Sequence, residues 1–575
     1  MLGRIPADAP NHQGGIPAQS LLLAGSVDSS FVTFIRFISP AVEHTGAGPE
    51  APSAPLRLCI ISAELAALEI NAGSLILCPE TVSFKYFWIE PMTSSAPKSA
   101  NIISPQVGLS ARLRIRRNYS GGGYTNAPRD WTLGIITGHR VLVTLCMALS
   151  ILFLYGLQDV LWANEKLPSN WGEVVESAAS IVWLGAVLPG TCGLLGLLMY
   201  RHPHELHAVQ PISQLVVFRI VSRGQNREAL QSTISRCVSE MQKGPMFDYL
   251  VEVVIEDVPG VGHLPKSDRI RYLVIPRNYS TPNTSLYKAR ALQFALENSR
   301  VPDNAWLVHL DEETQPTFSG IRGISKMIRE EEESGRLRVG QGAILYHRDW
   351  VRHPFLTLAD NVRTGDDFAR FHFQHRLGRT IFGLHGSYIV VRNDVEKSIG
   401  FDFGPQGSIT EDAFWALKLM EAGGRARWVE GYLEEQSTQS LGDFVRQRRR
   451  WYQGLIKVAI HTPVKLRWRL AIGANTLLWT FAPFAVIYTL LHMFLGTEIA
   501  AWIRALANFS FASFVTLYIT GLKANLDEFG IKDRVERVGW YCLQIILLPL
   551  FTLLEAAGVM LALMKPVAGF HVVKK

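Results

Sequence analysis

An acidic triplet, Asp311-Glu312-Glu313, directly follows the apolar run 305–310. The alternate carboxylates of Asp311 and Glu313 can point the same way, and oxygen ligands of this kind suit Mg²⁺ or Mn²⁺. Such a cation usually binds one or two carboxylates together with the phosphates of a substrate. The triplet is therefore a candidate metal site, although taken alone it is more typical of an ordinary acidic loop.

A second acidic group, Thr410-Glu411-Asp412, precedes a helix expected over 413–422. The positive end of that helix would keep Asp412 ionised, ready as a general base to accept a proton from a sugar hydroxyl. The same residues suit a simple helix start, with Thr410 as the N-cap and both acids in the first turn. Without other signals, the sequence favours the helix start.

A basic group, 447–451, lies on a helix expected over 441–460 and contains Gln447, Arg450 and Trp451. Apolar side chains alternate with the basic ones, which is typical of a helix at a membrane surface with arginines facing lipid phosphates. Arginine can also bind a diphosphate through two hydrogen bonds, and Trp451 could stack on a sugar ring. Both roles are compatible, because a helix at the membrane surface could also cover a binding cleft.

Two smaller groups add further candidates. Lys288 and Arg290 lie two residues apart on one expected helix, so their side chains diverge and one of them is expected to reach a substrate. His385 and Gly386 precede a strand-like segment, where the glycine allows close approach of a ligand. His385 is better suited to lining an acceptor site than to catalysis.

Alternating segments would position these residues. The strand-like segments are 215–221, 249–255, 271–275 and 305–310, and helix-like segments at 228–241 and 288–297 lie among them. Such alternation predicts an α/β fold with a mainly parallel sheet covered by helices. Ligands of such sheets bind beyond the carboxyl ends of the strands. Glu256, Asp257 and Asp311 all follow strands at that edge.

Long apolar runs lie on both sides of this segment. The runs are 141–158, 177–200, 470–497, 505–522 and 538–564. A helix needs about 20 apolar residues to cross a bilayer, and the chain is 48% hydrophobic with a mean hydropathy of +0.13. We therefore expect a multi-pass membrane protein that holds a water-exposed domain over 201–469.

Charge predicts how the chain is oriented. The chain has 57 basic and 50 acidic residues, a net charge of +7, and the arginines are concentrated beside the apolar runs. The positive-inside bias places the N-terminus and 201–469 in the cytosol, which leaves the sequons at Asn278 and Asn283 unused. Five crossings would put the C-terminus in the lumen, although it ends in Lys574-Lys575. Whether the number of crossings differs from five, or one of the apolar runs is re-entrant, stays open at this point.

The chain divides into four parts on this basis. We expect a poorly ordered extension over 1–110, a basic segment with two membrane helices over 111–200, the domain at 201–469, and about three membrane or re-entrant helices over 470–575. The modest net charge argues against a nucleic-acid partner. The six cysteines form no CxxC pair. Phosphate-loop, dinucleotide-binding, metalloprotease and serine-hydrolase motifs are absent.

Taken together, the three groups resemble the membrane-bound family 2 glycosyltransferases, which include cellulose and hyaluronan synthases and ceramide glucosyltransferases. The strings KARALQFALE, WLVHLDEET, HGSYIVV, FDFGPQGSITEDAFWA and QRRRWYQG resemble more closely the egghead-type β-1,4-mannosyltransferases, which extend glucosylceramide from GDP-mannose. The resemblance covers about 130–565. It implies a GT-A (Rossmann-like) catalytic domain, inversion at the anomeric carbon, and a location in the endoplasmic reticulum or Golgi.

The resemblance also implies roles for residues. Asp412 would be the base, and Asp311 and Glu313 would hold Mg²⁺ or Mn²⁺. The nucleotide-sugar donor would be bound by Ser222, Arg223, Glu256, Asp257, Lys288, Arg290, Asp311 and Arg450. The glycolipid acceptor would be bound by His385, Gly386, Glu411, Gln447 and Trp451.

Two alternatives remain open at this stage. A processive polysaccharide synthase would carry the same motifs and would differ in product length. A transporter or a catalytically inert scaffold would keep these acids for structural reasons. Acidic residues buried inside the apolar runs would favour a transporter, and Glu555 is the acidic residue that lies within such a run.

Overall fold

The computed structural model describes most of the chain from residue 138 onwards. The described residues are 138–162, 165–201, 206–259, 264–346 and 354–565, and a short antiparallel pair, β1 (Phe34–Arg36) and β2 (Cys59–Ile61). This pair belongs to a separate unit, residues 1–124, whereas 125–575 form the other unit. The rest of the extension expected over 1–110 lies outside the described residues.

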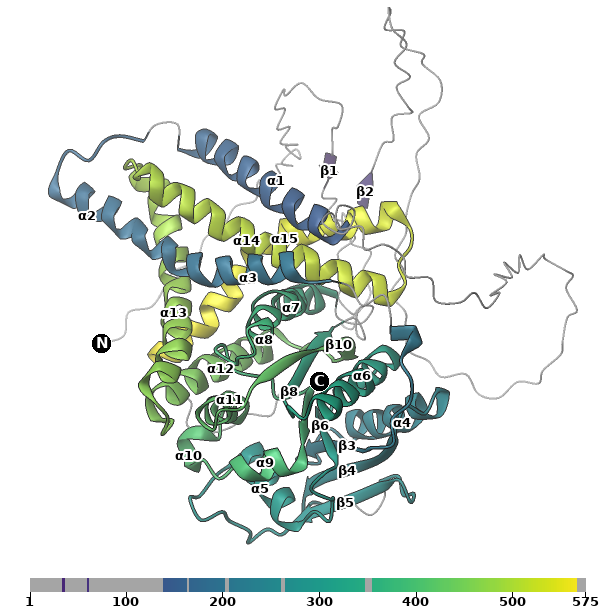
Figure 1. Ribbon diagram of the computed structural model, residues 1–575. Coiled ribbons are helices and arrows are strands. Elements are labelled where there is room, and N and C mark those ends of the chain that lie inside the picture. The colour runs from purple at the N-terminus through teal and green to yellow at the C-terminus, as the bar shows by residue number, and fades with distance from the viewer. Residues whose placement is uncertain are drawn as a thin grey trace, which may run out of the picture. The chain divides into compact units, whose positions relative to one another are not determined.

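An eight-stranded sheet forms the centre of the second unit (Figure 1). Its strands, in spatial order, are β5 (Ile270–Ile275), β4 (Asp248–Glu256), β3 (Leu215–Ser222), β6 (Trp306–Asp311), β9 (Ile389–Arg392), β8 (Val339–Leu345), β10 (Ala426–Glu434) and β7 (Gln315–Pro316). All four strands expected before residue 311 are present. They are continuous apolar runs because helices cover the sheet on both faces.

The sheet is mainly parallel, as the sequence predicts. β5, β4, β3 and β6 pair in parallel, and so do β8 and β10. β9 is antiparallel to both β6 and β8, and β7 is antiparallel to β10. The six parallel strands therefore end at one edge, which we call the carboxyl edge.

Five helices cover the two faces of this sheet. They are α4 (Arg227–Lys243), α6 (Phe318–Ser334), α5 (Tyr287–Asn298), α9 (Asn393–Ile399) and α11 (Glu411–Glu421). α4 and α6 pack on the face that carries Phe218, and α5, α9 and α11 pack on the face that carries Val217. Successive side chains of a strand point to opposite faces, so each strand contributes to both cores. This is the α/β architecture expected of a GT-A domain.

One charged side chain interrupts the apolar run of β3. Arg219 is fully buried and pairs with Glu252 of β4 at 2.9 Å and with Glu396 of α9 at 2.7 Å. His309 of β6 also bonds Glu396. Burial is tolerated because each charge has an opposite partner. An ion-pair network therefore joins β3, β4, β6 and α9 inside the domain.

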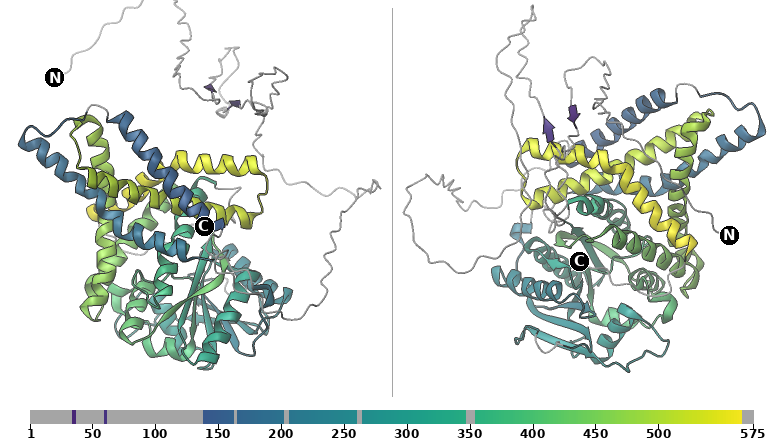
Figure 2. Two further views of the ribbon diagram at one scale, coloured as in Figure 1. Left: turned by 45° about the horizontal axis from the view of Figure 1, so that its top comes forward. Right: turned by 180° about the vertical axis from the view of Figure 1, so that it is seen from behind.

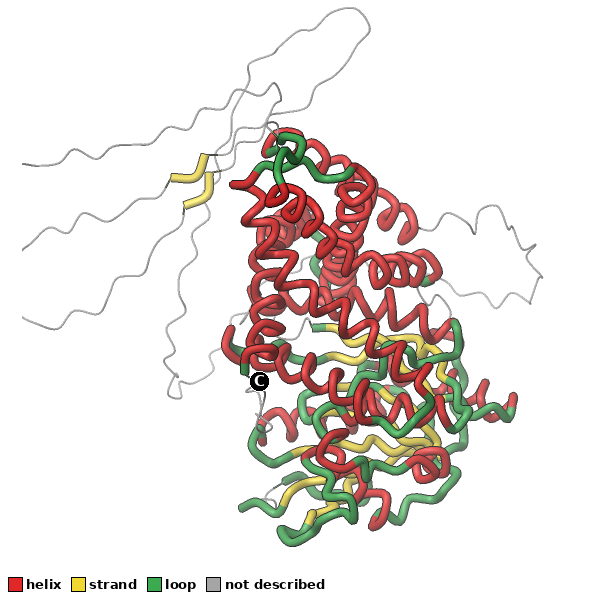
Figure 3. Tube along the Cα trace, turned by 90° about the vertical axis from the view of Figure 1, so that its left-hand side faces the viewer, coloured by secondary structure: helices red, strands yellow, loops and turns green. Residues whose placement is uncertain are grey.

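Five helical segments in the described residues have the length and composition of membrane spans, as the five apolar runs predict. They are α1 (Gly138–Leu161), the joined segment α2 (Trp171–Ala179), η2 (Ser180–Ala186) and α3 (Val187–Met199), α13 (Leu466–Leu495), α14 (Ala501–Phe529) and α15 (Arg534–Met564). The blue N-terminal helices α1 and α3 pack against α14 (Figure 2), and in Figure 3 the long red helices lie beside the domain that holds the strands. The protein is therefore a membrane protein.

Helix α14 has a different environment from the other four segments. Within its apolar window 67% of the residues are buried by protein, against 17% to 33% for the others. It packs backbone to backbone on α7 (Pro354–Asp366): a Cβ atom on Gly521 would lie 1.9 Å from the carbonyl oxygen of Asn361. α14 is thus one of the helices that join the membrane segments to the catalytic domain.

The remaining described elements connect these layers. They are η3 (Leu206–Ala208), the π-helical η5 (Asp367–Phe371), α8 (His372–Arg376), α10 (Gly404–Gly407) and α12 (Leu441–His461). α12 is the helix predicted over 441–460, and it starts where the Ser440 hydroxyl accepts a hydrogen bond from the Asp443 N–H. It contacts α13 and α15 on one side and α10 and α11 on the other.

Candidate active site

Charged side chains from three elements meet at the carboxyl edge. Lys288, in the first turn of α5, donates to Asp311 Oδ1 at 2.5 Å and to the Gly386 carbonyl oxygen at 2.7 Å. Its Nζ also lies 3.7 Å from Glu411 Oε1. Burial lowers the pKa of Lys288, but the charges of Asp311 and Glu411 outweigh burial and raise the pKa above its ordinary value. Lys288 therefore stays charged and holds the acids together.

Gly386 allows these groups to approach one another. A Cβ atom at this position would lie 3.0 Å from Lys288 Nζ, 3.3 Å from Asp412 Oδ2 and 3.7 Å from Asp311 Oδ2. A larger residue would place carbon among three charged atoms. The sequence predicts that this glycine allows close approach of a ligand; the structure places charged side chains of the protein next to it, and the ligand role stays a prediction.

Asp412 lies in the first turn of α11. Its Oδ1 accepts a hydrogen bond from the Ala413 N–H at 2.7 Å, and its Oδ2 is the atom that faces Gly386. Burial raises the pKa of Asp412, and the charge of Lys288 offsets only part of this effect. Burial and the charge of Asp412 also raise the pKa of Glu411. A carboxylate with a raised pKa is a better proton acceptor near neutral pH.

The expected capping by Thr410 is wrong in one respect. Thr410 occupies the N-cap position, but its side chain makes no cap hydrogen bond, and its buried hydroxyl has no hydrogen-bond partner. The methyl group of Thr410 instead faces Gly454 of α12, where a Cβ would lie 2.3 Å from it. The start of α11 is therefore fixed by packing against α12 rather than by the threonine cap.

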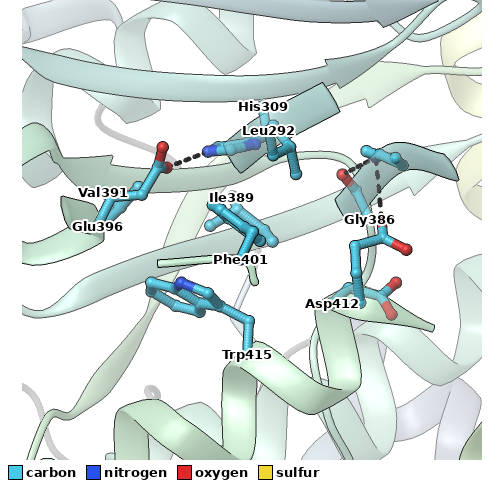
Figure 4. Close-up of a pocket in the computed structure, with 11 residues that line it drawn as sticks. Leu292, His309, Gly386, Ile389, Val391, Glu396, Phe401, Asp412 and Trp415 are labelled. Atoms are coloured by element: carbon cyan, nitrogen blue, oxygen red, sulfur yellow. Dashed lines mark hydrogen bonds and ion pairs between the residues drawn. The ribbon is translucent and has the colours of Figure 1, made fainter. Parts of the chain in front are cut away.

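A narrow pocket leads from Asp412 toward the sheet (Figure 4). Asp412 lies at one end, and the bonded pair His309 and Glu396 lies at the other. Phe401 and Trp415 form apolar wall between the two ends. This apolar wall explains why burial raises the pKa of Asp412, since few polar groups replace the water it has lost.

The acidic triplet divides as its spacing predicts. Glu312 turns away from the edge and accepts hydrogen bonds from Ser222 Oγ at 2.5 Å and Asn226 Nδ2 at 2.6 Å. Burial, followed by the charge of Glu313, raises the pKa of Glu312 to about 7. Asp311 and Glu313, the alternate residues, are left partly exposed at the carboxyl edge.

These two carboxylates suit a Mg²⁺ or Mn²⁺ ion that also binds a diphosphate. The described residues hold no group of three or more histidine, cysteine or acidic side chains placed to bind a metal by themselves. Two carboxylates at an open strand edge are nevertheless the protein's usual share of such a site, because substrate phosphates and water supply the other oxygens. The donor set at Asp311 and Glu313 therefore fits the expected cation.

The expected nucleotide-binding residues separate into two groups. Ser222 lies beside the triplet, whereas Arg223 is exposed just beyond β3. Arg290 pairs with both oxygens of Glu256 at 2.5 Å, away from Lys288, as the spacing of the two cations predicts. Exposed Asp257 pairs with Arg277 at 3.2 Å. The parts that Arg223, Glu256, Asp257 and Arg290 play in donor binding stay predictions.

Helix α12 brings Arg450 to the acids. Burial lowers the pKa of Arg450, while the charges of Glu411, Asp311, Asp412 and Glu313 act to raise it. All four carboxylates are thus near enough to interact with one guanidinium. A cation in this position suits the phosphates of a donor, as the sequence predicts.

Gln447 and Trp451, on the same helix, contact arginines that the sequence reasoning did not single out. Gln447 Oε1 accepts from Arg448 Nη1 at 2.7 Å. The guanidinium groups of Arg448 and Arg363 each lie 4.7 Å from the centre of the Trp451 ring. A sugar stacked on Trp451 would share the ring with these groups, and the acceptor role of both residues stays a prediction.

His385 packs against Phe371 and lies beside Asp367. Its ring lies 4.1 Å from that of Phe371, centre to centre, and Nε2 is 3.3 Å from Asp367 Oδ1. Burial lowers the pKa of His385 to about 3, so the ring is neutral at physiological pH. The expected role of His385 in lining an acceptor site stays a prediction.

Arg448 is the clearest residue that sequence reasoning missed. It is buried, and it pairs with Asp360 of α7 at 2.8 Å and with Glu555 of α15 at 2.7 Å. The available signal was Glu555, a single acid in a long apolar run, which requires a cationic partner somewhere in the fold. The pairing itself spans 107 residues of sequence and could not be read from a local pattern.

The chain is similar to known glycosyltransferases. The family model described as "Glycosyl transferase family group 2" matches residues 306–521. Beta-1,4-mannosyltransferase bre-3 of Caenorhabditis briggsae is 29% identical over 391 residues, 67% of this chain and 84% of the relative. Beta-1,4-mannosyltransferase egh of Drosophila melanogaster is 29% identical over 409 residues, 69% of this chain and 86% of the relative. A solved mannosyltransferase of Pyrobaculum calidifontis, in complex with GDP-Man and Mn²⁺, aligns with 69% of this chain and 99% of its own at 11% identity and a TM-score of 0.36.

The acids at the carboxyl edge, the helix that carries Arg450 and the sequence matches agree with one another. The chain is a glycosyltransferase with a GT-A-like α/β domain, and its residues 306–521 match the model of family group 2. It is similar to the two animal β-1,4-mannosyltransferases over most of their length.

Proposed function

We propose that the protein transfers mannose from GDP-mannose to a membrane glycolipid, such as glucosylceramide, in β-1,4 linkage with inversion. The observation that carries this proposal is the match to relatives named β-1,4-mannosyltransferases over 84% to 86% of their length. The residues expected to perform the transfer lie within the matched family region or beside it in the fold.

Asp412 is the general base in this proposal. Its partly buried carboxylate accepts the proton of the acceptor hydroxyl, whose oxygen then attacks the anomeric carbon from the face opposite the diphosphate. Lys288 and Gly386 hold the position of Asp412 relative to Asp311. The proton transfer and the departure of the diphosphate thus take place at neighbouring points of one edge.

Arg450 and the strand-edge acids bind the donor. Asp311 and Glu313 would hold Mg²⁺ or Mn²⁺, which when bound neutralises negative charge on the leaving diphosphate. Arg450, on α12, faces the same acids and supplies a fixed positive charge from the protein. Ser222 fixes Glu312, so that the two flanking acids remain at the edge.

A lipid acceptor suits the position of the site. α12 contacts the active-site helix α11 on one side and the apolar helices α13 and α15 on the other. We expect the catalytic domain to face the cytosol from the endoplasmic reticulum or Golgi, because basic residues flank the apolar runs. A cytosolic sugar nucleotide and a membrane-embedded acceptor would then meet at α12.

A donor screen tests the proposal directly. The purified full-length protein in detergent is given glucosylceramide and each of several sugar nucleotides, and products are read by mass. We expect one hexose to be added from GDP-mannose and little from the corresponding UDP-sugars. Products with a ladder of added hexoses would favour a processive synthase, and transfer from UDP-glucose alone would overturn the assignment of the donor.

A further inference from the structure

The long helices of the membrane region have two ends. At the end away from the catalytic domain, the loops between α1 and α2 and between α13 and α14 meet. Lys166 forms a β-bridge with Thr497, His492 lies 2.9 Å from Glu165, and Arg504 pairs with the same glutamate. We call this the distal end.

The opposite end contacts the catalytic domain. Near the start of α1, His139 bonds the Leu197 carbonyl oxygen at the end of α3 at 3.0 Å, and His372 of α8 bonds Gly196 of α3 at 3.1 Å. At the end of α14, Asn525 Oδ1 accepts from the Tyr346 N–H at 2.8 Å. α1, α2–α3, α13 and α14 each run between the two ends, so each can cross a bilayer once.

Helix α15 has its first contacts at the catalytic end. Near its start, Arg537 pairs with Asp527 of α14 at 2.7 Å, directly after the part of α14 that bonds the catalytic domain. About one third of the way along, Gln544 Oε1 accepts from Asn361 of α7 at 2.8 Å. The first half of α15 therefore lies against the catalytic domain.

The second half of α15 remains at the catalytic end. Glu555 pairs with Arg448 of α12, and the Ala562 carbonyl oxygen accepts from Gln453 of α12 at 2.8 Å. The Lys565 carbonyl oxygen accepts from Arg449, also on α12, at 3.0 Å. α12 is the helix whose Gly454 packs against Thr410 beside the catalytic acid. Both ends and the middle of α15 thus contact catalytic-side elements.

The length of α15 bears on whether this helix crosses the membrane. Its 31 residues would span about 46 Å if straight, which exceeds the roughly 30 Å of a bilayer core. A crossing helix of that length would have one end far from the catalytic domain. Neither end of α15 lies far from the catalytic domain, so its apolar composition alone does not make it a membrane-crossing helix.

The two faces of α15 indicate what it contacts. Its protein-facing side is buried and carries Gln544, Leu548, Phe551, Val559 and Ala562. The opposite side is a helical stripe of exposed apolar residues: Val535, Val538, Ile545, Ile546, Leu550, Leu553, Leu561 and Met564. Within the apolar run, Gln544 and Glu555 bond protein groups on α7 and α12. A stripe of this length, like the exposed apolar residues of α1 and α13, matches lipid rather than water.

We infer that α15 does not cross the membrane but lies along it on the side of the catalytic domain, with its exposed stripe in the lipid. The chain then crosses four times, through α1, α2–α3, α13 and α14. The segment after residue 565 begins on the same side as the catalytic domain. This answers the question left open by the sequence, because an even count places Lys574-Lys575 with the other basic residues. The inference does not rest on the donor or the acceptor.

Two tags test the inference in the full-length protein. One epitope tag follows Lys575, and a second, in a separate variant, is inserted with a flexible linker after Gly496 in the distal loop. Cells are treated with digitonin, which opens only the plasma membrane, and tags are stained before and after full permeabilisation. An antibody to the catalytic domain gives the reference side. Retained transferase activity shows that each tagged protein has folded.

We expect the C-terminal tag to stain together with the catalytic domain and the distal-loop tag to stain oppositely. A C-terminal tag that behaves like the distal-loop tag would overturn the inference. As a second measurement, sealed microsomes of the C-terminally tagged protein are treated with protease. The tag and the catalytic domain should be lost together, and survival of one without the other would also overturn it.

Discussion

Asp412 and Glu411 are neighbours in the chain, but their carboxylates have different surroundings. Glu411 is buried and lies 3.7 Å from Lys288, whereas Asp412 is half-buried and directs Oδ2 toward Gly386. Both carboxylates have a raised pKa, and Asp412 is the more exposed of the two. This difference leads to three predictions for single residues.

Replacing Asp412 with asparagine separates the roles of base and helix start. Asparagine is about as good as aspartate near a helix N-terminus, so the change should cost on the order of 1 kcal/mol or less in stability. It cannot accept the proton, and loss of a positioned base costs about 10²–10⁴ in rate. We expect Asp412→Asn to fold and bind donor nucleotide but to transfer sugar at least about a hundredfold more slowly. Glu411→Gln is the matched control and should lose less activity. If Asp412→Asn keeps more than about a tenth of the rate, the base lies elsewhere.

The pH profile should report the charge of Asp412. The base acts when ionised, and its raised pKa means that activity falls with decreasing pH well above the ordinary aspartate value of about 4. The positive charge of Lys288 lowers this pKa, so Lys288→Met should raise it further and move the acid limb of kcat/KM to higher pH. Arg290→Met is the control, because Arg290 pairs with Glu256 instead. An acid limb that does not move in Lys288→Met would contradict the assignment.

Metal removal tests Asp311 and Glu313. Two carboxylates would repel a diphosphate unless a cation lies between them, so EDTA should stop transfer and Mg²⁺ or Mn²⁺ should restore it. Asp311→Ala should be inactive at every metal concentration. Glu312→Gln is the control, because Glu312 bonds Ser222 and Asn226 rather than facing the edge. Full activity in EDTA would make Asp311 a structural acid.

Among the secondary-structure elements, helix α12 contributes to the site in several ways. It carries Arg450 toward the acids and packs Gly454 against Thr410. The ion pairs that Arg448 forms with Asp360 and Glu555 hold the helix in place. Because Arg448 also bonds Gln447, its ion pairs can set the position of the expected acceptor-binding face. Arg448 is thus a positioning residue rather than a catalytic one.

Arg448→Met should therefore impair acceptor use beyond its effect on folding. Removing one partner of a buried ion pair typically costs about 3–5 kcal/mol, so thermal stability should fall. Adding Asp360→Asn and Glu555→Gln removes the unpaired charges and should recover much of that stability. The triple variant should still show a raised KM for the acceptor, or a rate lowered by up to about 10²-fold, with donor affinity unchanged. Arg449→Met, at the half-buried neighbouring residue, is the control. A triple variant with normal acceptor kinetics would reduce Arg448 to a structural role.

At the scale of the whole molecule, sequence predicted the elements better than their partners. Buried parallel strands read as apolar runs, so β3, β4, β5 and β6 were found from residues alone, and α12 from its alternation of basic and apolar side chains. The antiparallel direction of β9 and β7 could not be predicted, because strand direction depends on the path of the intervening chain. The same reason explains the missed ion pairs of Arg219 and Arg448, whose partners are 33 to 177 residues away.

The candidate site was predictable to a similar extent. The order of Asp311, Asp412 and Arg450 along the chain indicated a shared chemistry, and the structure brings their charges together. Their contacts with Lys288 and Gly386 depend on where α5 and the residues before β9 end in space. The membrane runs were found from composition, but composition cannot distinguish a crossing helix from one that lies beside the membrane.

One of the close contacts between the catalytic domain and the membrane helices is that of α7 with α14. A Cβ on Gly521 would lie 1.9 Å from the Asn361 carbonyl oxygen, and one on Gly365 would lie 2.0 Å from the Leu517 carbonyl oxygen. These atoms belong to the backbone, so no side chain can rotate away to make room. Each glycine therefore fixes how closely the two helices approach.

Gly521→Ala should consequently separate α7 from α14. Overpacking costs about 1–3 kcal/mol or more, which exceeds the roughly 1 kcal/mol that alanine gains over glycine in a helix. We expect a lower Tm in detergent and a larger loss of activity toward a long-chain glycolipid in membranes than toward a short-chain, water-soluble acceptor, because the site itself is intact but displaced from the lipid. Gly539→Ala is the matched control, since a Cβ there has no atom within 4 Å, and it should leave Tm unchanged or slightly raised. Equal losses on both acceptors, or a Tm equal to that of Gly539→Ala, would show that α14 does not hold the catalytic domain against the membrane.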